Sequence, residues 1–175
     1  TEPLGPGRAR LSDLYVVRSE DRVPDSFILD GLTPGVSRLT NRDLATCVVA
    51  VSDNAATNLL IQRVGLERVE AMLAQADLGQ THLRRRMMDL AAARAGRENV
   101  ATPRELARLL TLLHHGKLLE PALTEDLLLV LSTPKDGMLA RLLPEEVRVA
   151  SKPGSLEGVR CDAGIIYAAG RPFVV

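Results

Sequence analysis

The sequence predicts a mixed α/β (α+β) fold, in which helices precede an antiparallel sheet. Apolar residues recur at helical spacing up to about residue 131. From Val147 onward the pattern becomes that of extended chain, with the runs VRVAS, VRCDAGIIYAA and PFVV separated by glycine turns. Helices first and strands last are typical of an antiparallel sheet that helices cover. A short extended segment is also expected near the start, at residues 14–18.

Capping residues predict the helices of the first half. Thr40 should cap a helix that ends near Ser52. A second helix, capped by Ser52 or Asp53, should run to Gly65, because glycine readily adopts the conformation that ends helices. A third should follow over residues 66–76. The apolar positions expected to face inward are Leu44, Cys47, Val48 and Val51, then Leu59, Leu60 and Val64, then Val69, Met72, Leu73 and Ala76.

The second half begins with a polar segment and then a clear helix start. Residues 81–99 are expected to be a loop with one helical turn. Thr102, Pro103 and Glu105 supply a cap oxygen, a proline at the first helical position and a carboxylate in the first turn. A further helix is expected over Pro121–Leu131.

Composition excludes several classes of protein. The chain has 22 basic and 22 acidic residues, and this balance gives no sign of a nucleic-acid or anionic-membrane partner. The longest apolar run, residues 127–131, is far shorter than the roughly 20 residues of a membrane-spanning helix. Two cysteines, Cys47 and Cys161, are too few for a disulfide framework or a zinc site, and we expect free, buried thiols.

Two stretches carry residues suited to acyl transfer: SDN, Ser52–Asn54, and KPGS, Lys152–Ser155. Each has an ordinary reading by itself, since Ser, Asp and Asn are preferred helix caps and a strand lysine is usually solvated. Acyl transfer to a serine, however, needs a base, a donor to the leaving nitrogen and amide donors for the oxyanion. The pair of stretches, separated by about 100 residues, can supply several of these groups.

Together the two stretches resemble the serine β-lactamases and penicillin-binding proteins, most of all the class A-like β-lactamases. The segments TNRDLATCVVAVSDNAATNLLIQRVG, TPRELARLLTLL, LARLLPEEVRVASKPGS and VRCDAGIIY resemble that family in order and spacing. The resemblance implies a β-lactamase/transpeptidase-like fold with two partial subdomains. Residues 1–145 would be mostly helical and carry SDN, and residues 146–175 would be C-terminal strands that carry KPGS.

The resemblance also implies a role for each site residue. Ser52 would relay a proton to the leaving nitrogen, and the Asn54 amide would hold the catalytic lysine and the side-chain amide of the substrate. Asp53 would only tie down the turn. The remaining residues lie on the expected strand: Lys152 would supply positive potential for the substrate carboxylate and for Ser52, Gly154 would let the substrate lie flat, and the Ser155 N–H would form half of an oxyanion hole.

The chain departs from the family pattern at the nucleophile. The family's Ser-x-x-Lys precedes SDN, whereas the one match here, Ser132–Lys135 in STPK, follows it and is interrupted by Pro134. The resemblance therefore implies a fragment that starts after the nucleophile helix, stops before the closing helix and is inactive alone. We expect an apolar groove that a further segment or a second chain could fill.

Two smaller departures affect turnover and substrate binding. The sequence has no glutamate where the family's deacylating glutamate is expected, and the nearest carboxylates are Asp89 and Glu98. Either residue could take that role. Rapid deacylation is not expected. Pro153 replaces the usual threonine, which removes a hydroxyl and a backbone donor, a change that an edge strand tolerates.

The function implied by the resemblance is hydrolysis of β-lactam amide bonds through an acyl-serine intermediate. The alternatives are a penicillin-binding D-alanyl peptidase or esterase, and a non-catalytic β-lactam-binding sensor. No metal or organic cofactor is implied. The partner would be a small-molecule β-lactam or D-alanyl peptide, and the family habit points to a periplasmic or secreted protein.

Overall fold

The structure is a computed structural model that describes residues 10–168 and 170–175. It divides into two compact units, residues 1–100 and residues 101–175, which are described separately. The predicted mixture of helices and antiparallel sheets is confirmed. The subdomain boundary expected at residue 145 is a different division and stays a prediction.

The first unit combines a two-stranded sheet with helices. Its elements are β1 (Leu14–Val16), the short 3₁₀ helices η1 (Ser19–Asp21) and η2 (Leu29–Gly31), β2 (Arg38–Thr40), α1 (Asn41–Val51), α2 (Asn54–Val64), α3 (Leu66–Gln75) and α4 (Leu90–Arg94). Strands β1 and β2 pair antiparallel, with Tyr15 opposite Leu39. Thr40 caps α1 as predicted, because its hydroxyl accepts a hydrogen bond from the Asp43 N–H at 3.1 Å.

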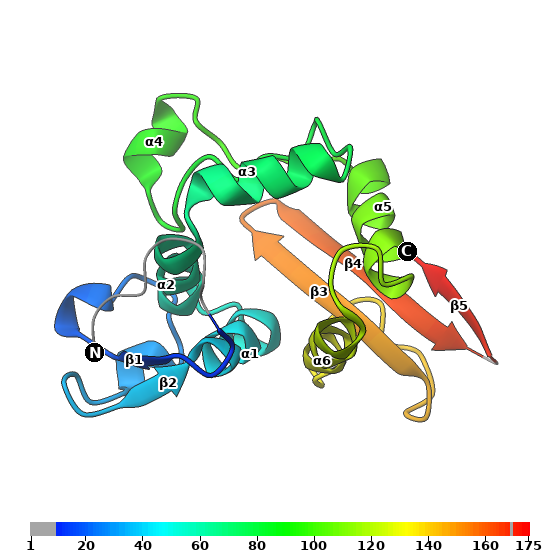
Figure 1. The fold of residues 1–175 in the computed structure, drawn as a ribbon, viewed down its shortest axis with the longest axis horizontal. Helices are drawn as coiled ribbons and strands as arrows, with labels where there is room; N and C mark the ends of the chain where they lie inside the picture. The colour runs from blue at the N-terminus through cyan, green and yellow to red at the C-terminus, as the bar shows by residue number, and fades with distance from the viewer. Residues whose placement is uncertain (1–9, 169) are drawn as a thin grey trace. The chain divides into compact units, whose positions relative to one another are not determined.

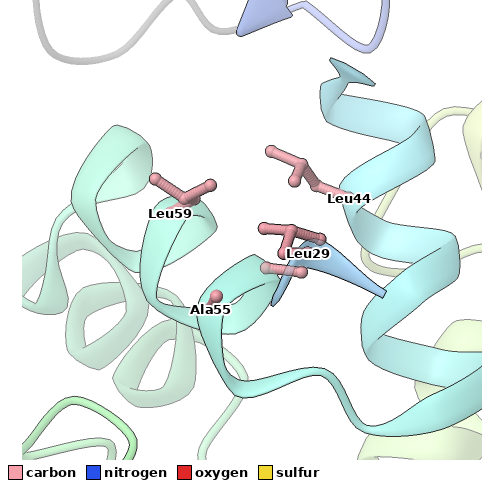
Figure 2. Packing of buried hydrophobic residues seen from close by; sticks show 5 residues of the cluster. Leu29, Leu44, Ala55 and Leu59 are labelled. Atoms are coloured by element: carbon pink, nitrogen blue, oxygen red, sulfur yellow. The ribbon is translucent and has the colours of Figure 1, made fainter. Parts of the chain in front are cut away.

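A small apolar core fixes the junction between α1 and α2. Figure 2 shows Leu44 of α1 and Leu59 of α2 closing around Leu29 of η2, with Ala55 at the start of α2 beside them. Ala56 completes the buried cluster. Burial of one leucine side chain contributes about 2 kcal/mol. The turn between the two helices, which carries SDN, is therefore anchored from both sides.

Several predicted apolar faces are wrong in detail. Met72 and Val64 were expected to face inward, yet they are 40% and 38% exposed. Leu59 of α2 and Leu73 of α3 are buried as predicted, but α2 also buries Ile61, which was not expected to face inward. Periodicity shows that a helix has an apolar side, but the neighbouring elements decide which residues they cover. Cys161 was likewise expected to be buried and is exposed.

The second unit is a three-stranded antiparallel sheet covered by two helices. Its elements are α5 (Pro103–His114), α6 (Pro121–Leu131), β3 (Arg148–Leu156), β4 (Val159–Ala168) and β5 (Arg171–Val174), with strand order β3-β4-β5. Helix α6 lies against β3, and α5 lies against β4 and β5 (Figure 1). The buried apolar residues of this unit are Leu113, Leu128, Val130, Leu131, Ala150, Ile165 and Ile166.

Strand β3 is longer than the sequence predicts. The extended run VRVAS ends at Ser151, but β3 continues to Leu156, and Gly154 and Ser155 lie on the strand as the resemblance implies. The register runs through Pro153 without a break. Within the described sheet β3 pairs only with β4, so the expectation that Pro153 lies on an edge strand is confirmed for these residues.

Candidate active site

The SDN stretch forms the turn that joins α1 to α2. Ser52 has φ 55° and ψ 37°, the left-handed conformation, and its N–H donates to the Val48 carbonyl at 3.1 Å. Non-glycine residues seldom adopt this conformation, and those that do are concentrated at functional sites. The conformation ends α1 and lets α2 begin two residues later, with Ser52 exposed on the first unit.

Asp53 holds this turn from inside. Its side chain is fully buried, and Oδ1 accepts the Ala56 N–H at 2.9 Å as the N-cap of α2. Oδ2 accepts the N–H groups of Ile28 and Leu29 at 2.9 Å and 3.0 Å. The carboxylate thus joins the turn to a segment 24 residues earlier, and the expected structural role of Asp53 is confirmed.

Asn54 follows the turn and is braced by the same earlier segment. Its Nδ2 donates to the Pro24 carbonyl at 3.0 Å. The buried Ser26 hydroxyl accepts the Ala55 N–H at 2.9 Å and donates to the Val23 carbonyl at 2.7 Å. These bonds hold the Asn54 side chain half-buried at the start of α2. Its expected contact with substrate stays a prediction.

The KPGS stretch lies on β3. Lys152 and Gly154 share one face of the strand, since side chains alternate, and Pro153 and Ser155 share the other. The Lys152 Nζ donates to the Pro153 carbonyl at 2.6 Å. Burial lowers the pKa of Lys152, and the nearby side chains of Asp162 and Cys161 oppose that shift. Lys152 is therefore a half-buried cation rather than a fully solvated one.

Asp162 and Lys135 lie outside the KPGS stretch, and sequence reasoning did not connect either residue with it. Asp162 lies opposite Pro153 in the β3–β4 register, and its Oδ2 accepts the Leu139 N–H at 3.1 Å. Burial lowers the pKa of Lys135, and the charge of Lys152 lowers it further while Asp162 opposes the shift. A hairpin centred on Glu157 and Gly158 would have predicted the position of Asp162. Lys135 was considered only as the lysine of the Ser-x-x-Lys match.

The two carboxylates considered for deacylation both have structural partners. Asp89 is the N-cap of α4, with Oδ1 accepting the Ala92 N–H at 2.9 Å. Glu98 pairs with Arg85, whose Nε donates to Oε1 at 2.8 Å. The same segment is held by the Asn58 amide, which exchanges two hydrogen bonds with the backbone of Met87.

A hydrogen bond between His82 Nδ1 and Glu70 Oε2, 2.7 Å long, lies at the start of this segment and gives a pH-dependent prediction. The hydrogen bond from His82 lowers the pKa of Glu70, and the Leu83 N–H, 2.6 Å from Oε1, lowers it further. Because the folded-state pKa is depressed, this stabilisation is present above the unfolded pKa of about 4.3 and is lost as the pH falls through the folded value. Relative to its intrinsic rate, the Leu83 amide should exchange hydrogen roughly tenfold faster at a pH below the folded-state pKa of Glu70 than at about pH 6.

The measurement is amide hydrogen exchange followed by NMR. In Glu70→Gln the side chain keeps an acceptor oxygen but does not titrate, so the protection of the Leu83 amide should be the same at both pH values. Equal protection of that amide at both pH values in the unsubstituted protein would contradict the prediction.

Among residues 10–168 and 170–175, no three His, Cys, Asp or Glu side chains lie together in a way that could hold a metal ion. No helix in the same described part of the chain is both long and apolar enough to cross a membrane.

Comparison with known proteins shows a match over almost the whole chain. The model of a family described as the beta-lactamase enzyme family matches residues 2–175. A β-lactamase of Sphaerobacter thermophilus is similar in structure, with 33% identity and a TM-score of 0.85. The alignment covers 94% of this chain and 63% of that one. No curated protein matches.

Two further structures are similar. An ancestral class A β-lactamase has 28% identity and a TM-score of 0.82, with coverage of 95% of this chain and 65% of that one. A mutant of PBP-A, in an acyl-enzyme complex with penicillin G, has 24% identity and a TM-score of 0.81, and this likeness concerns the fold alone. The alignment with this PBP-A mutant covers 94% of this chain and 61% of the mutant's chain. The chain thus spans less than two thirds of the length of each of these three structures.

Proposed function

We propose that this chain, which belongs to the beta-lactamase enzyme family, carries the proton-relay and substrate-binding residues of an acyl-serine hydrolase that acts on β-lactam amide bonds. The observation that carries the proposal is the SDN turn. A buried Asp53 carboxylate with three backbone donors holds the turn, and Ser52 is presented on it in a conformation that non-glycine residues seldom adopt. Such preorganisation is what catalysis by fixed polar groups requires.

Each site residue then has a chemical task. Ser52 would pass a proton to the leaving nitrogen, and the Asn54 amide would bind the catalytic lysine and the substrate's side-chain amide. Lys152 would place a positive charge beside the substrate carboxylate. Gly154 would leave room for the substrate, and the Ser155 N–H would bind the developing oxyanion, where loss of one donor typically costs about 3 kcal/mol of transition-state stabilisation.

The nucleophile is not Ser132, although Ser132–Lys135 is the chain's one Ser-x-x-Lys. The Ser132 hydroxyl donates to the Leu128 carbonyl at 2.7 Å and accepts from Arg148 Nε at 2.8 Å, so it is occupied at the end of α6. The acylated serine would therefore be one that these 175 residues do not include. Catalysis is proposed for the whole protein, not for this chain alone.

β-Lactams are the substrate class best supported, because the relative with 33% identity is a β-lactamase. Deacylation should be slow, since Asp89 caps a helix and Glu98 pairs with Arg85. A D-alanyl peptidase or esterase of the penicillin-binding type, or a sensor that binds without turnover, would share the same groups.

We further propose a periplasmic or secreted location. The exposed Phe27 and Val36 would be covered by a further segment or second chain.

The test is the intact mass of the whole protein before and after incubation with benzylpenicillin. A mass increase equal to one penicillin, absent after prior denaturation, is the expected result. Slow return to the original mass would indicate a hydrolase with slow turnover, and a permanent adduct would favour the penicillin-binding alternative. Reversible binding with no adduct on the folded protein would overturn the acyl-serine function and leave the sensor.

A further inference from the structure

The loop of residues 81–99, which belongs to the first unit, carries an excess of positive charge. It has five arginines against two carboxylates, so its formal net charge is +3 with His82 neutral, although that of the whole chain is +0. The arginines are Arg84, Arg85, Arg86, Arg94 and Arg97, and the carboxylates are Asp89 and Glu98. A local excess of this kind attracts anions even where the charges of the whole molecule balance. The balance of the whole chain therefore does not exclude an anionic partner for this loop.

Most of this positive charge is exposed to solvent. Arg85 is the exception, because its guanidinium group pairs with Glu98. The other four arginines, Arg84, Arg86, Arg94 and Arg97, are exposed. Among residues 10–168 and 170–175, the side chains of Arg86, Arg94 and Arg97 form no salt bridge. The second carboxylate of the loop, Asp89, is already the N-cap of α4. Three exposed guanidinium groups are thus available to an external partner.

Hydrogen bonds at the neck of the loop bring its two limbs together. The His82 N–H donates to the Val100 carbonyl at 2.8 Å, and the Val100 N–H donates to the His82 carbonyl at 3.1 Å. Next to this bridge, Asn99 Oδ1 accepts the N–H groups of Arg84 and Arg85 at 2.8 Å and 3.0 Å. The limb that begins at His82 therefore runs antiparallel to the limb that ends at Val100, and the two lie side by side.

The rest of the loop is folded back on itself and is held to α2. The Arg97 N–H donates to the Ala92 carbonyl at 3.0 Å, which brings the second limb against α4 at the far end of the loop (Figure 1). The Asn58 amide of α2 binds the backbone of Met87 on the first limb. The exposed arginines thus stand on one internally bonded loop, so binding a partner requires little further ordering of the backbone.

The donors of this loop suit phosphate groups. A guanidinium group stays charged at ordinary pH and presents its N–H donors in a planar fork that can bind two phosphate oxygens at once. One exposed ion pair contributes little, so firm binding needs a partner in which several phosphates meet several arginines together. We propose that the loop of residues 81–99 is a binding site for a phosphate polymer, a chain of linked phosphate groups such as inorganic polyphosphate.

Two other phosphate-bearing partners fit the loop less well. Single-stranded nucleic acid is bound through aromatic side chains on which its bases stack, and residues 81–99 contain no Phe, Tyr or Trp. Binding to a membrane surface uses a broad apolar face, whereas the one large apolar side chain exposed on this loop is that of Leu90, at 51%. The partner that the loop fits is therefore charged and multivalent, and needs neither bases nor acyl chains.

The experiment measures the binding of inorganic polyphosphate to the whole protein at several salt concentrations. In the triple variant Arg86→Gln/Arg94→Gln/Arg97→Gln the dissociation constant at low salt should rise at least about tenfold. The slope of log affinity against log salt should become shallower by about 2, or roughly 0.7 for each charge removed. Because the three side chains form no salt bridge in the described chain, this variant should fold normally, which urea unfolding checks.

A second triple variant is the matched control. Arg18→Gln/Arg22→Gln/Arg38→Gln removes three exposed arginines of the same unit that lie outside the loop. It changes the net charge of the protein by the same amount, so it should raise the dissociation constant for polyphosphate less than about threefold.

Equal weakening in the two triple variants would mean that net charge alone attracts the polymer, and it would overturn the inference. An unchanged affinity in the loop variant would do the same. The inference also fails if, at equal phosphate concentration, the unsubstituted protein binds oligodeoxythymidylate or phosphatidylglycerol vesicles more tightly than polyphosphate. None of these measurements involves acylation, so the inference and the proposed function are tested independently.

Discussion

Replacing Asp53 with alanine should lower the free energy of unfolding by about 3–5 kcal/mol. The substitution removes the N-cap of α2, which by itself typically costs about 1 kcal/mol. It also leaves the N–H groups of Ile28 and Leu29 without their acceptor. The buried Leu29 N–H costs about 1–3 kcal/mol when it loses its partner, because it cannot bond to water instead, and the part-buried Ile28 N–H costs less. The measurement is urea unfolding with linear extrapolation to zero denaturant.

Asp89 offers a matched control for this prediction. It is also an aspartate at an N-cap, but it is exposed, and its carboxylate caps a single N–H, that of Ala92. Asp89→Ala should therefore cost only about 1 kcal/mol. If the two variants were equally stable, the bonds from Asp53 to the earlier segment would contribute nothing, and the account of the turn given above would be wrong.

The helix starts could be predicted from sequence because capping is local chemistry. Thr40 caps α1 as predicted, and the Thr102 hydroxyl accepts the Glu105 N–H at 3.2 Å at the start of α5. Between the two predicted caps for α2, the structure selects Asp53, since Ser52 adopts the left-handed conformation. In each of these cases the donor and acceptor lie within a few residues of each other, so the sequence contains both partners of the bond.

The features that sequence reasoning missed depend on residues far apart in the chain. The hydrogen bond from the Leu29 N–H to the Asp53 carboxylate joins residues 24 positions apart in the chain, and no periodicity of the sequence indicates it. Asp162 accepts the Leu139 N–H only because the loop after α6 packs on β4, 23 residues away in the chain. The exposure of Met72 likewise depends on which elements cover α3. Local chemistry therefore predicts where elements begin, whereas the partners of a site residue follow from packing.

Replacing Gly154 with alanine should slow acylation by benzylpenicillin about 100-fold, the size of effect that a misplacement of about 1 Å can cause. The added methyl group would stand on the strand where the substrate is proposed to lie. The fold should tolerate it, because the nearest atom is the Sγ of Cys161 at 2.8 Å, and that exposed thiol can rotate away. We expect a change of less than about 1 kcal/mol in the free energy of unfolding. Acylation rates and urea unfolding measure the two effects.

Two further variants separate obstruction of the substrate from distortion of the sheet. In Gly164→Ala the new Cβ would lie 2.6 Å from Ser151 Cβ and 2.9 Å from the Ala150 carbonyl, so a backbone must move, at a cost of about 1–3 kcal/mol. In the double variant Gly154→Ala/Cys161→Ala the thiol is gone, and the methyl group has room. If acylation stays slow in the double variant, the methyl group itself blocks the substrate, as the proposed role of Gly154 requires. If the rate recovers, displacement of Cys161 was the cause, and Gly154 is needed for packing between β3 and β4 rather than for the approach of the substrate.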